Sequence, residues 1–302
     1  MATERQQKET VDRRKARKAD FKKAEASRPL WDDVAPVVVQ TPAPDWTFGA
    51  GPNHTHAQTS ASATTAKHIA IDPYAPDRSL LDNYKLLVSG VVPRPIAFIS
   101  TRSRDGKSEN LAPMSYFQLV NVDPPILVVG LMSPMARAKD TLLNLLETRE
   151  CVINVVSEGI IEAVNATSID APYGVSEWEI AGLTPVYDCH TVSCARVRES
   201  VFSMEARLES VREFSSRSKP GTKAGTLETL EVTYFWARED ALNEGRNELD
   251  LAVLRPMSRL GGMAFGRTTQ VIELMRPDFD TDLEGLGGLE KLREANKART
   301  GS

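Results

Sequence analysis

The sequence predicts a mainly β protein, a barrel or a sandwich with peripheral helices, and three observations lead to this prediction. Segments with strand character follow one another without regularly intervening helices, which disfavours a doubly wound parallel sheet. Pro124-Pro125 opens an apolar run, 126–132, that has the length and Val/Ile content of a buried strand. Residues 201–211 alternate between apolar and polar side chains, as a strand with one buried face does.

Further strands are expected at 95–101 and 151–156, which are rich in Val and Ile. In the segment 201–211 the polar side chains share the face that we expect to be wet: Ser203, Glu205, Arg207 and Glu209. A second alternating segment follows the turn-rich residues 215–225 and contains Leu230, Val232, Tyr234 and Trp236. The two segments therefore predict a long antiparallel hairpin.

Two helices are expected. Leucines at helical spacing predict a helix over 140–149, with Asp140 as its N-cap. A charged segment predicts a second helix over about 289–298.

Charge is distributed unevenly along the 302 residues. Residues 1–28 contain ten Lys or Arg against five Asp or Glu, although the whole chain has a net charge of −4. An acidic body with a short basic leader predicts no specific nucleic-acid partner. The leader is expected to be a solvated, partly helical tail. The Pro-, Ser- and Thr-rich residues after it are expected to form an extended arm, so the chain divides into 1–72, a body 73–275 and a tail 276–302.

The longest apolar run is far shorter than the roughly 20 residues that a membrane span needs, so no membrane partner is expected. We expect a cytoplasmic protein, with the nucleus as an alternative through the basic leader. The three cysteines, Cys151, Cys189 and Cys194, lack the spacing of a disulfide framework or a zinc site, so no metal site is expected. The sequence contains no Gly-x-Gly-x-x-Gly, Walker or Gly-x-Ser-x-Gly motif, which disfavours nucleotide folds and Ser/His hydrolysis.

One segment has the features of an anion site. Arg137 and Lys139 immediately precede the predicted helix, and Thr141 lies in its first turn. Free N–H groups, the positive end of the helix dipole and two cations favour a phosphate, with an exposed turn as the alternative. A second segment, Asn110 to Phe117, is rich in hydrogen-bonding and aromatic groups; its alternative interpretation is a strand that enters the core.

Several motifs, in this order and spacing, resemble the flavin reductase-like family of FMN-binding split barrels. They are Val92-Pro-Arg-Pro-Ile-Ala-Phe-Ile-Ser-Thr, Asp105-Gly-Lys-Ser-Glu-Asn-Leu-Ala-Pro-Met-Ser-Tyr-Phe, Asp123-Pro-Pro, Lys139-Asp-Thr-Leu-x-Asn, Asn165-Ala-Thr-Ser and Arg259-Leu-Gly-Gly. The resemblance covers about 80–268, and the arm, with Thr41-Pro-Ala-Pro-Asp-Trp-Thr-Phe-Gly, looks like the extensions of fungal members.

The resemblance implies an antiparallel six-stranded split β-barrel that forms a homodimer, with FMN held at the subunit interface. It also implies that Arg137, Lys139 and Thr141 bind the phosphate, with Arg94 as a further candidate or a structural ion pair. The resemblance implies that further residues lie against the flavin ring and the ribityl chain, two of them from a neighbouring loop. These expected cofactor-binding residues are Ser100, Thr101, Asn110, Ala112, Ser115, Tyr116 and Phe117, with Asn165 and Ser168 from the loop.

The expected function is an FMN-dependent oxidoreductase. It either passes hydride from NAD(P)H to flavin or acts as an oxygenase-type flavoprotein on a small organic substrate. Such chemistry needs positioning of the cofactor more than acids or bases from the protein, so no catalytic residue is assigned. Two alternatives stay open: a flavin-binding carrier, sensor or partner subunit without turnover, and a groove that holds haem or a deazaflavin.

Overall fold

The computed structural model describes residues 4–53 and 66–300, so residues 54–65 of the expected arm lie outside the described residues. The chain divides into two compact units, 1–35 and 36–302. The first contains α1 (Glu4–Ala26), which is exposed at every residue from Asp12 onward, as expected for a solvated leader. Within the described residues, no helix has both the length and the apolar character needed to cross a membrane.

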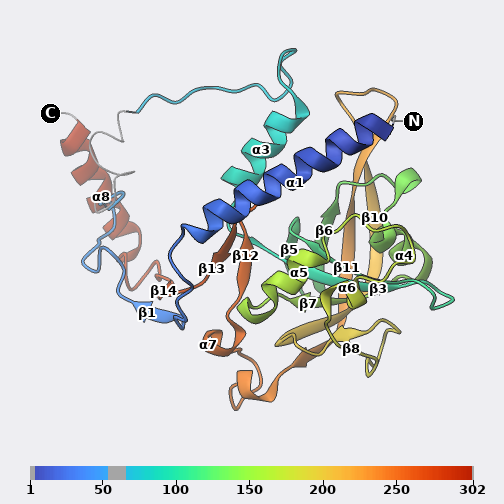
Figure 1. Ribbon diagram of the computed structural model, residues 1–302. Coiled ribbons are helices and arrows are strands. Elements are labelled where there is room, and N and C mark those ends of the chain that lie inside the picture. Colours follow the sequence, from blue (N-terminus) through green and yellow to red (C-terminus); the bar gives the residue numbers. More distant parts are fainter. Residues whose placement is uncertain (1–3, 54–65, 301–302) are drawn as a thin grey trace. The chain divides into compact units, whose positions relative to one another are not determined.

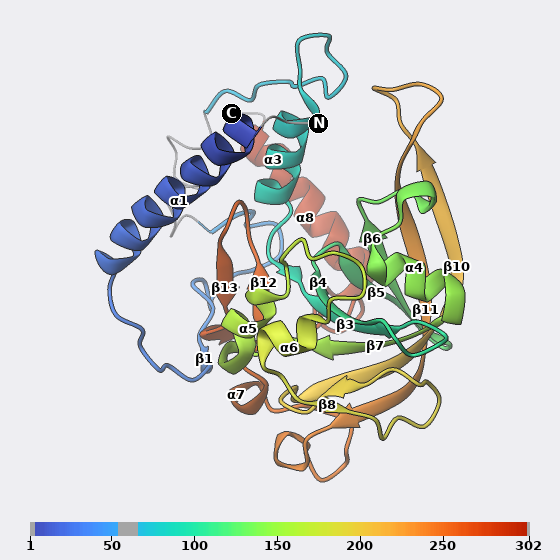
Figure 2. The ribbon, with the colours of Figure 1, turned by 45° about the vertical axis from the view of Figure 1, so that its right-hand side comes forward.

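A seven-stranded antiparallel sheet forms the centre of the second unit, in the order β4-β3-β7-β10-β11-β6-β5 (Figures 1 and 2). The sheet and its helices make this a mixed α/β fold on a large antiparallel sheet, with more helix than the sequence predicts. The expected strands and hairpin are confirmed. In chain order the strands are β3 (Ala97–Arg102), β4 (Glu109–Met114), β5 (Phe117–Val122), β6 (Pro125–Leu131), β7 (Glu150–Val155), β10 (Phe202–Ser215) and β11 (Lys223–Ala237).

Smaller sheets and helices complete the unit. β1 (Val37–Val39) pairs with β14 (Gln270–Ile272), and β8 (Pro185–Val186) pairs with β9 (Arg196–Val197). β2 (Arg94–Pro95), β12 (Met257–Arg259) and β13 (Phe265–Arg267) form a three-stranded sheet. The helices are α3 (Leu80–Gly90), α4 (Asp140–Thr148), α5 (Ile161–Ala166), α6 (Glu177–Ala181), α7 (Leu251–Leu254) and α8 (Gly285–Thr300), the last of which contains the expected 289–298.

The two edges of the large sheet, β4 and β5, are consecutive in the chain. Only Ser115 and Tyr116 separate them, and the N–H of Gly130 in β6 donates to the Tyr116 carbonyl over 2.7 Å at this bend. A Cβ at position 130 would lie 3.2 Å from the Cβ of Tyr116, so glycine permits this close approach. One bent segment of chain therefore belongs to both edges of the sheet.

The sheet separates two hydrophobic clusters. Ile99 packs with Leu142 and Leu230 in the cluster on one face, which we call the inner cluster. Phe98 packs with Val164 and Trp178 in the cluster on the opposite face, which we call the outer face. Adjacent residues of β3 thus point to opposite faces, as strand geometry requires. Five of these six residues are 0% exposed, and Trp178 is 6% exposed.

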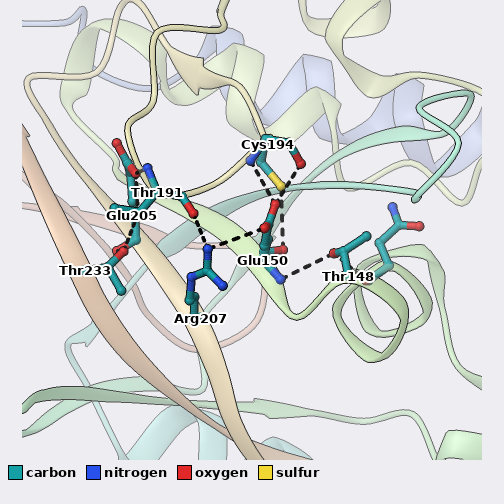
Figure 3. A network of polar contacts seen from close by, with 9 residues as sticks. Thr148, Glu150, Thr191, Cys194, Glu205, Arg207 and Thr233 are labelled. Carbon is teal, nitrogen blue, oxygen red and sulfur yellow. Dashed lines mark hydrogen bonds and ion pairs between the residues drawn. The ribbon is translucent and has the colours of Figure 1, made fainter.

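The prediction that the polar side chains of residues 201–211 face water is wrong for the first half of that segment. Ser203 and Glu205 are buried, because the segment 187–197 covers them, whereas Arg207 and Glu209 are exposed as expected. Figure 3 shows Thr191 of this covering segment in contact with Glu205. A covering loop without periodic sequence could not be inferred from the alternation of the strand.

The second alternating segment also changes face. Ala206 pairs with Val232 but Glu205 pairs with Tyr234, so Thr233 is an extra residue in β11. Such a β-bulge reverses the alternation. Val232 is consequently buried in the inner cluster, whereas Tyr234 and Trp236 lie on the outer face.

The expected N-cap of the helix α4 is wrong by one residue. Asp140 is its first residue and Lys139 is the N-cap, because the carbonyl of Lys139 accepts the first helical hydrogen bond, from the N–H of Leu143. Lys139 is therefore held at the point where the free N–H groups of the helix begin.

Candidate functional site

Two adjoining cavities lie at the bend between β4 and β5. One of about 220 Å³ extends toward α3, and one of about 200 Å³ extends toward α5. They share Pro113, Ser115 and Arg259, so they are two parts of one groove. The groove brings together five of the expected cofactor-binding residues: Arg94, Ser115, Tyr116, Asn165 and Ser168.

Arg94 is fixed by backbone carbonyls. Its Nη1 donates to Val88 O at 2.7 Å and to Val91 O at 2.6 Å, and its Nη2 donates to Leu260 O at 3.1 Å. The residue is only 8% exposed, and within the described residues its Nε has no hydrogen-bond partner. These bonds join the end of α3 to the loop after β12, and they leave the positive charge at the wall of the groove.

Arg259 was not expected as a site residue, although the motif Arg259-Leu-Gly-Gly belongs to the resemblance. Its guanidinium stacks on the ring of Phe265, with Cζ 4.4 Å from the ring centroid, and donates to the carbonyls of Gly262 and Ala264. Burial lowers the pKa of Arg259, and the nearby charge of Arg94 lowers it further. Tyr84 and Phe265 were also missed, because only the fold brings them to the groove. Pro113 was missed although it lies inside the segment Asn110 to Phe117.

A buried polar cluster joins β3 and β4 to the first turns of α4. The Nδ2 of Asn110 donates to Thr141 Oγ1 at 2.8 Å, and the Nδ2 of Asn144 donates to Thr101 Oγ1 at 3.2 Å. All four residues are at most 5% exposed. The cluster therefore holds the amino end of α4 against β4, and the sequence had placed three of its members, Thr101, Asn110 and Thr141, in one site.

The two expected cations are exposed at this helix end. Lys139 Nζ lies 3.2 Å from an Asp170 carboxylate oxygen, and both side chains are largely exposed. Asp170 follows Ser168 by two residues, so this ion pair joins the amino end of α4 to the segment that lines the groove. Burial raises the pKa of Asp140 beside it. Arg137 is exposed one turn earlier, in the segment Met135–Arg137.

Three expected residues lie elsewhere in these strands. The hydroxyl of Ser100 donates to the Ala195 carbonyl, under the segment that covers the outer face. Phe117 packs against the inner hydrophobic cluster, and Ala112 is half-buried in β4 opposite Ile99. None of these three is among the described residues that line the groove, and they stay predictions as cofactor-binding residues.

The cysteines do not provide reactive thiolates. Burial raises the pKa of both Cys189 and Cys194 to about 12, and it raises that of Cys151 still more strongly. Thiols with such values remain protonated at neutral pH. Among the described residues that line the groove there is also no cysteine.

Known proteins resemble the body of this chain. Residues 89–254, more than half of the chain, match the model of the flavin reductase like domain. An uncharacterized protein of Halalkalibacterium halodurans is 35% identical over 204 residues, which cover 67% of this chain and 95% of that protein. This bacterial relative gives no support to the likeness between the arm and fungal extensions.

Solved structures agree with the sequence match. Component B of nitrilotriacetate monooxygenase from Bacillus cereus has a TM-score of 0.64 and 31% identity, covering 70% of this chain and 100% of that one. A split-barrel protein from Shewanella frigidimarina has a TM-score of 0.58 and 19% identity over 70% of this chain and 100% of that one, a likeness in fold alone. On the family match and the identity to its relatives, the chain belongs to the flavin reductase-like family.

Proposed function

We propose that this protein is an FMN-binding oxidoreductase that transfers hydride from NAD(P)H to flavin. One observation carries the proposal: the polar cluster holds the amino end of α4, with Lys139 and Arg137 exposed beside it, against the strand that leads into the groove. An anion site and a cavity for a ring system are thereby joined by β4. The family membership supports a flavin as the ligand.

The donor groups present fit a phosphate. The first N–H groups of α4 have no acceptor within the helix, and they lie at the positive end of its dipole. Asp170 competes with an anion for Lys139, but an exposed ion pair contributes only about 0–1 kcal/mol, so a phosphate can replace it. We therefore assign the phosphate to Lys139, Arg137 and the first turn of α4.

The groove fits one edge of a planar ring. Pro113 and Phe265 supply apolar surface, and Ser115, Asn165 and Ser168 supply groups that can donate or accept hydrogen bonds. A bound flavin supplies the hydride-accepting chemistry, which no residue of the protein needs to perform. The chain's own residues orient the ring and exclude water from one of its faces.

We also propose a homodimer on a six-stranded split barrel, in which β4 and β5 count as one bent strand. The edge strand β5 exposes Leu119, Val120 and Val122, the last at 79%. An apolar edge strand is a surface that another chain covers. Sedimentation velocity should therefore give a dimer, and Val122→Lys should shift it toward a monomer; a wild-type monomer at micromolar concentration would contradict this part.

The phosphate assignment is tested by comparing FMN with riboflavin, which lacks the phosphate. We expect Lys139→Ala to weaken FMN binding about 10- to 100-fold and to leave riboflavin binding unchanged, because one charge-assisted hydrogen bond is lost. Asp170→Asn should strengthen FMN binding, since it frees Lys139. Lys107→Ala is the matched control, because Lys107 is also exposed and paired with an aspartate, Asp105. Equal losses for both flavins would contradict the assignment.

Turnover is measured as oxidation of NADH and of NADPH with added FMN. A rate well above that of free flavin supports the reductase. Flavin binding without such a rate would contradict it and favour a carrier, a partner subunit or an oxygenase-type flavoprotein.

A further inference from the structure

The part of the groove toward α3 has an unusual set of polar side chains. Its cavity of about 220 Å³ is lined by two arginines, two tyrosines and a serine: Arg94, Arg259, Tyr84, Tyr116 and Ser115. Among the described residues that line it, none is an aspartate or a glutamate. The remaining lining is largely apolar and includes Val88, Pro113 and Leu131. The cavity therefore presents hydrogen-bond donors and positive charge inside an apolar wall.

The two positive charges lack acidic partners in the described part of the chain. Arg94 donates to three backbone carbonyls, and Arg259 donates to two carbonyls of its own loop. Carbonyls satisfy hydrogen bonds but do not neutralise a charge, and burying an unneutralised charge is costly. Arg94 is more than nine-tenths buried and its Nε lacks a partner there. An anion in the cavity would offset this cost.

The phenols lie close to the same charges. Burial raises the pKa of Tyr116, Tyr84 raises it further, and Arg94 opposes this rise. Arg259 is likewise influenced by both Tyr84 and Arg94. The four side chains line one small volume, and the two phenol hydroxyls are groups that can donate hydrogen bonds into it.

We propose that this cavity binds the carboxylate of a small organic acid, with Arg259 and Tyr84 as its binding groups and Arg94 as the fixed charge behind them. At about 220 Å³ the cavity is below the usual range of roughly 300–1,000 Å³ for drug-sized ligands, which favours a small acid over a dinucleotide. The role of the acid as a substrate rests on the proposed function, because the cavity adjoins the flavin groove. Its binding does not depend on that function.

The binding is tested by titrating the full-length protein with benzoate and, separately, with benzamide, using calorimetry and thermal unfolding. The two probes share shape but differ in charge. We expect benzoate to bind at least about tenfold more tightly than benzamide and to raise the unfolding temperature. Inorganic phosphate is the third probe, because the same donors could hold a phosphate group.

Two substitutions locate the site. Arg259→Gln should weaken benzoate about tenfold or more, and Tyr84→Phe should weaken it by about three- to tenfold. Tyr84 is 42% exposed, so its variant should fold even if Arg259→Gln does not. The matched control is Arg212→Gln, which removes an exposed arginine that also stacks on a phenylalanine, Phe214, and should leave benzoate binding unchanged.

Three results would overturn the proposal: equal binding of benzoate and benzamide, unchanged benzoate binding in both site variants, or a preference for phosphate over benzoate that Arg259→Gln abolishes. FMN retention is measured on the same samples by absorbance. Retained FMN without benzoate binding would refute this inference and leave the proposed function standing. Benzoate binding that depends on Arg259, in a protein that binds no flavin, would support the cavity and refute the function.

Discussion

Two glutamates on the β10–β11 hairpin are both fully buried, yet they lie in opposite environments. Glu205 in β10 points to the outer face, under the segment 187–197, and Glu228 in β11 lies between the inner strands β6 and β10. Neither has any exposed surface. The difference between them lies in the number of hydrogen bonds that each carboxylate accepts.

Glu205 is surrounded by donors. The N–H groups of His190 and Thr191, the hydroxyl of Thr191 and the indole N–H of Trp236 all donate to its carboxylate. Burial pushes the pKa of Glu205 upward, but these hydrogen bonds outweigh it, so the net pKa is lowered. Figure 3 shows the polar network that continues from Thr191 through Arg207 to Glu150.

Glu228 has none of these partners. Within the described residues neither of its carboxylate oxygens accepts a hydrogen bond, and the nearby hydroxyl of Thr226 donates to the Ser133 carbonyl instead. Burial raises the pKa of Glu228. At equal burial, the charged form is therefore favoured in Glu205 and the neutral form in Glu228, and the hydrogen-bond donors make the difference.

The largest expected effect is that of Glu205→Ala. Removal of the Glu205 carboxylate leaves four hydrogen-bond donors without their acceptor, so we expect the free energy of unfolding to fall by about 3 kcal/mol. Urea unfolding measures it. Glu209→Ala, four residues along the same strand and exposed, is the control and should change stability by less than about 0.5 kcal/mol. A similar small change for Glu205→Ala would show that the covering segment does not depend on this carboxylate.

Glu228→Leu should have a smaller effect of opposite sign. Replacing an unpartnered buried carboxyl with an apolar side chain of similar size should raise the free energy of unfolding by about 1–2 kcal/mol. Glu231→Leu, which changes an exposed glutamate of the same strand, is the control. A loss of stability in Glu228→Leu would mean that the carboxyl has a partner that stabilises it.

The strands of this hairpin were predictable, but their surroundings were not. The alternation in 201–211 reports which side chains share a face, and it carries no information about a segment that folds over that face. For this reason Glu205 was expected in water. The bulge at Thr233 is likewise invisible in the sequence, because Val232 and Tyr234 are both compatible with either face.

In the candidate site too, some residues could be predicted from the local sequence and others could not. Lys139 and Thr141 could be placed at a helix start, where the structure has them, because a helix start has a local sequence signature. Arg259 and Tyr84 were missed because they are 175 residues apart in the sequence and meet only when β12 pairs with β2 near the end of α3. Local chemistry can be predicted from sequence, whereas a cavity built by distant segments requires the fold.

Thr191→Val tests one hydrogen bond of the satisfied glutamate. The hydroxyl of Thr191 is removed at nearly constant volume while its backbone N–H continues to donate to Glu205. We expect a loss of about 1 kcal/mol, less than for Glu205→Ala, because one donor is lost rather than an acceptor shared by four. Thr229→Val on β11 is the control. A loss as large as that of Glu205→Ala would place the main contribution in the hydroxyl.

The smallest expected effect is in the pH dependence, which should have opposite directions for the two glutamates. A folded pKa below the usual 4.5 means that Glu205 contributes stability above pH 4.5, which is lost as the pH falls through the folded value. A raised folded pKa means that Glu228 costs stability increasingly as the pH rises above 4.5. The difference between wild type and Glu205→Ala should therefore shrink on acidification below pH 4.5. The gain from Glu228→Leu should instead be larger at pH 8 than at pH 4.5, and a gain that does not change between these values would mean that Glu228 titrates alike in the folded and unfolded chains.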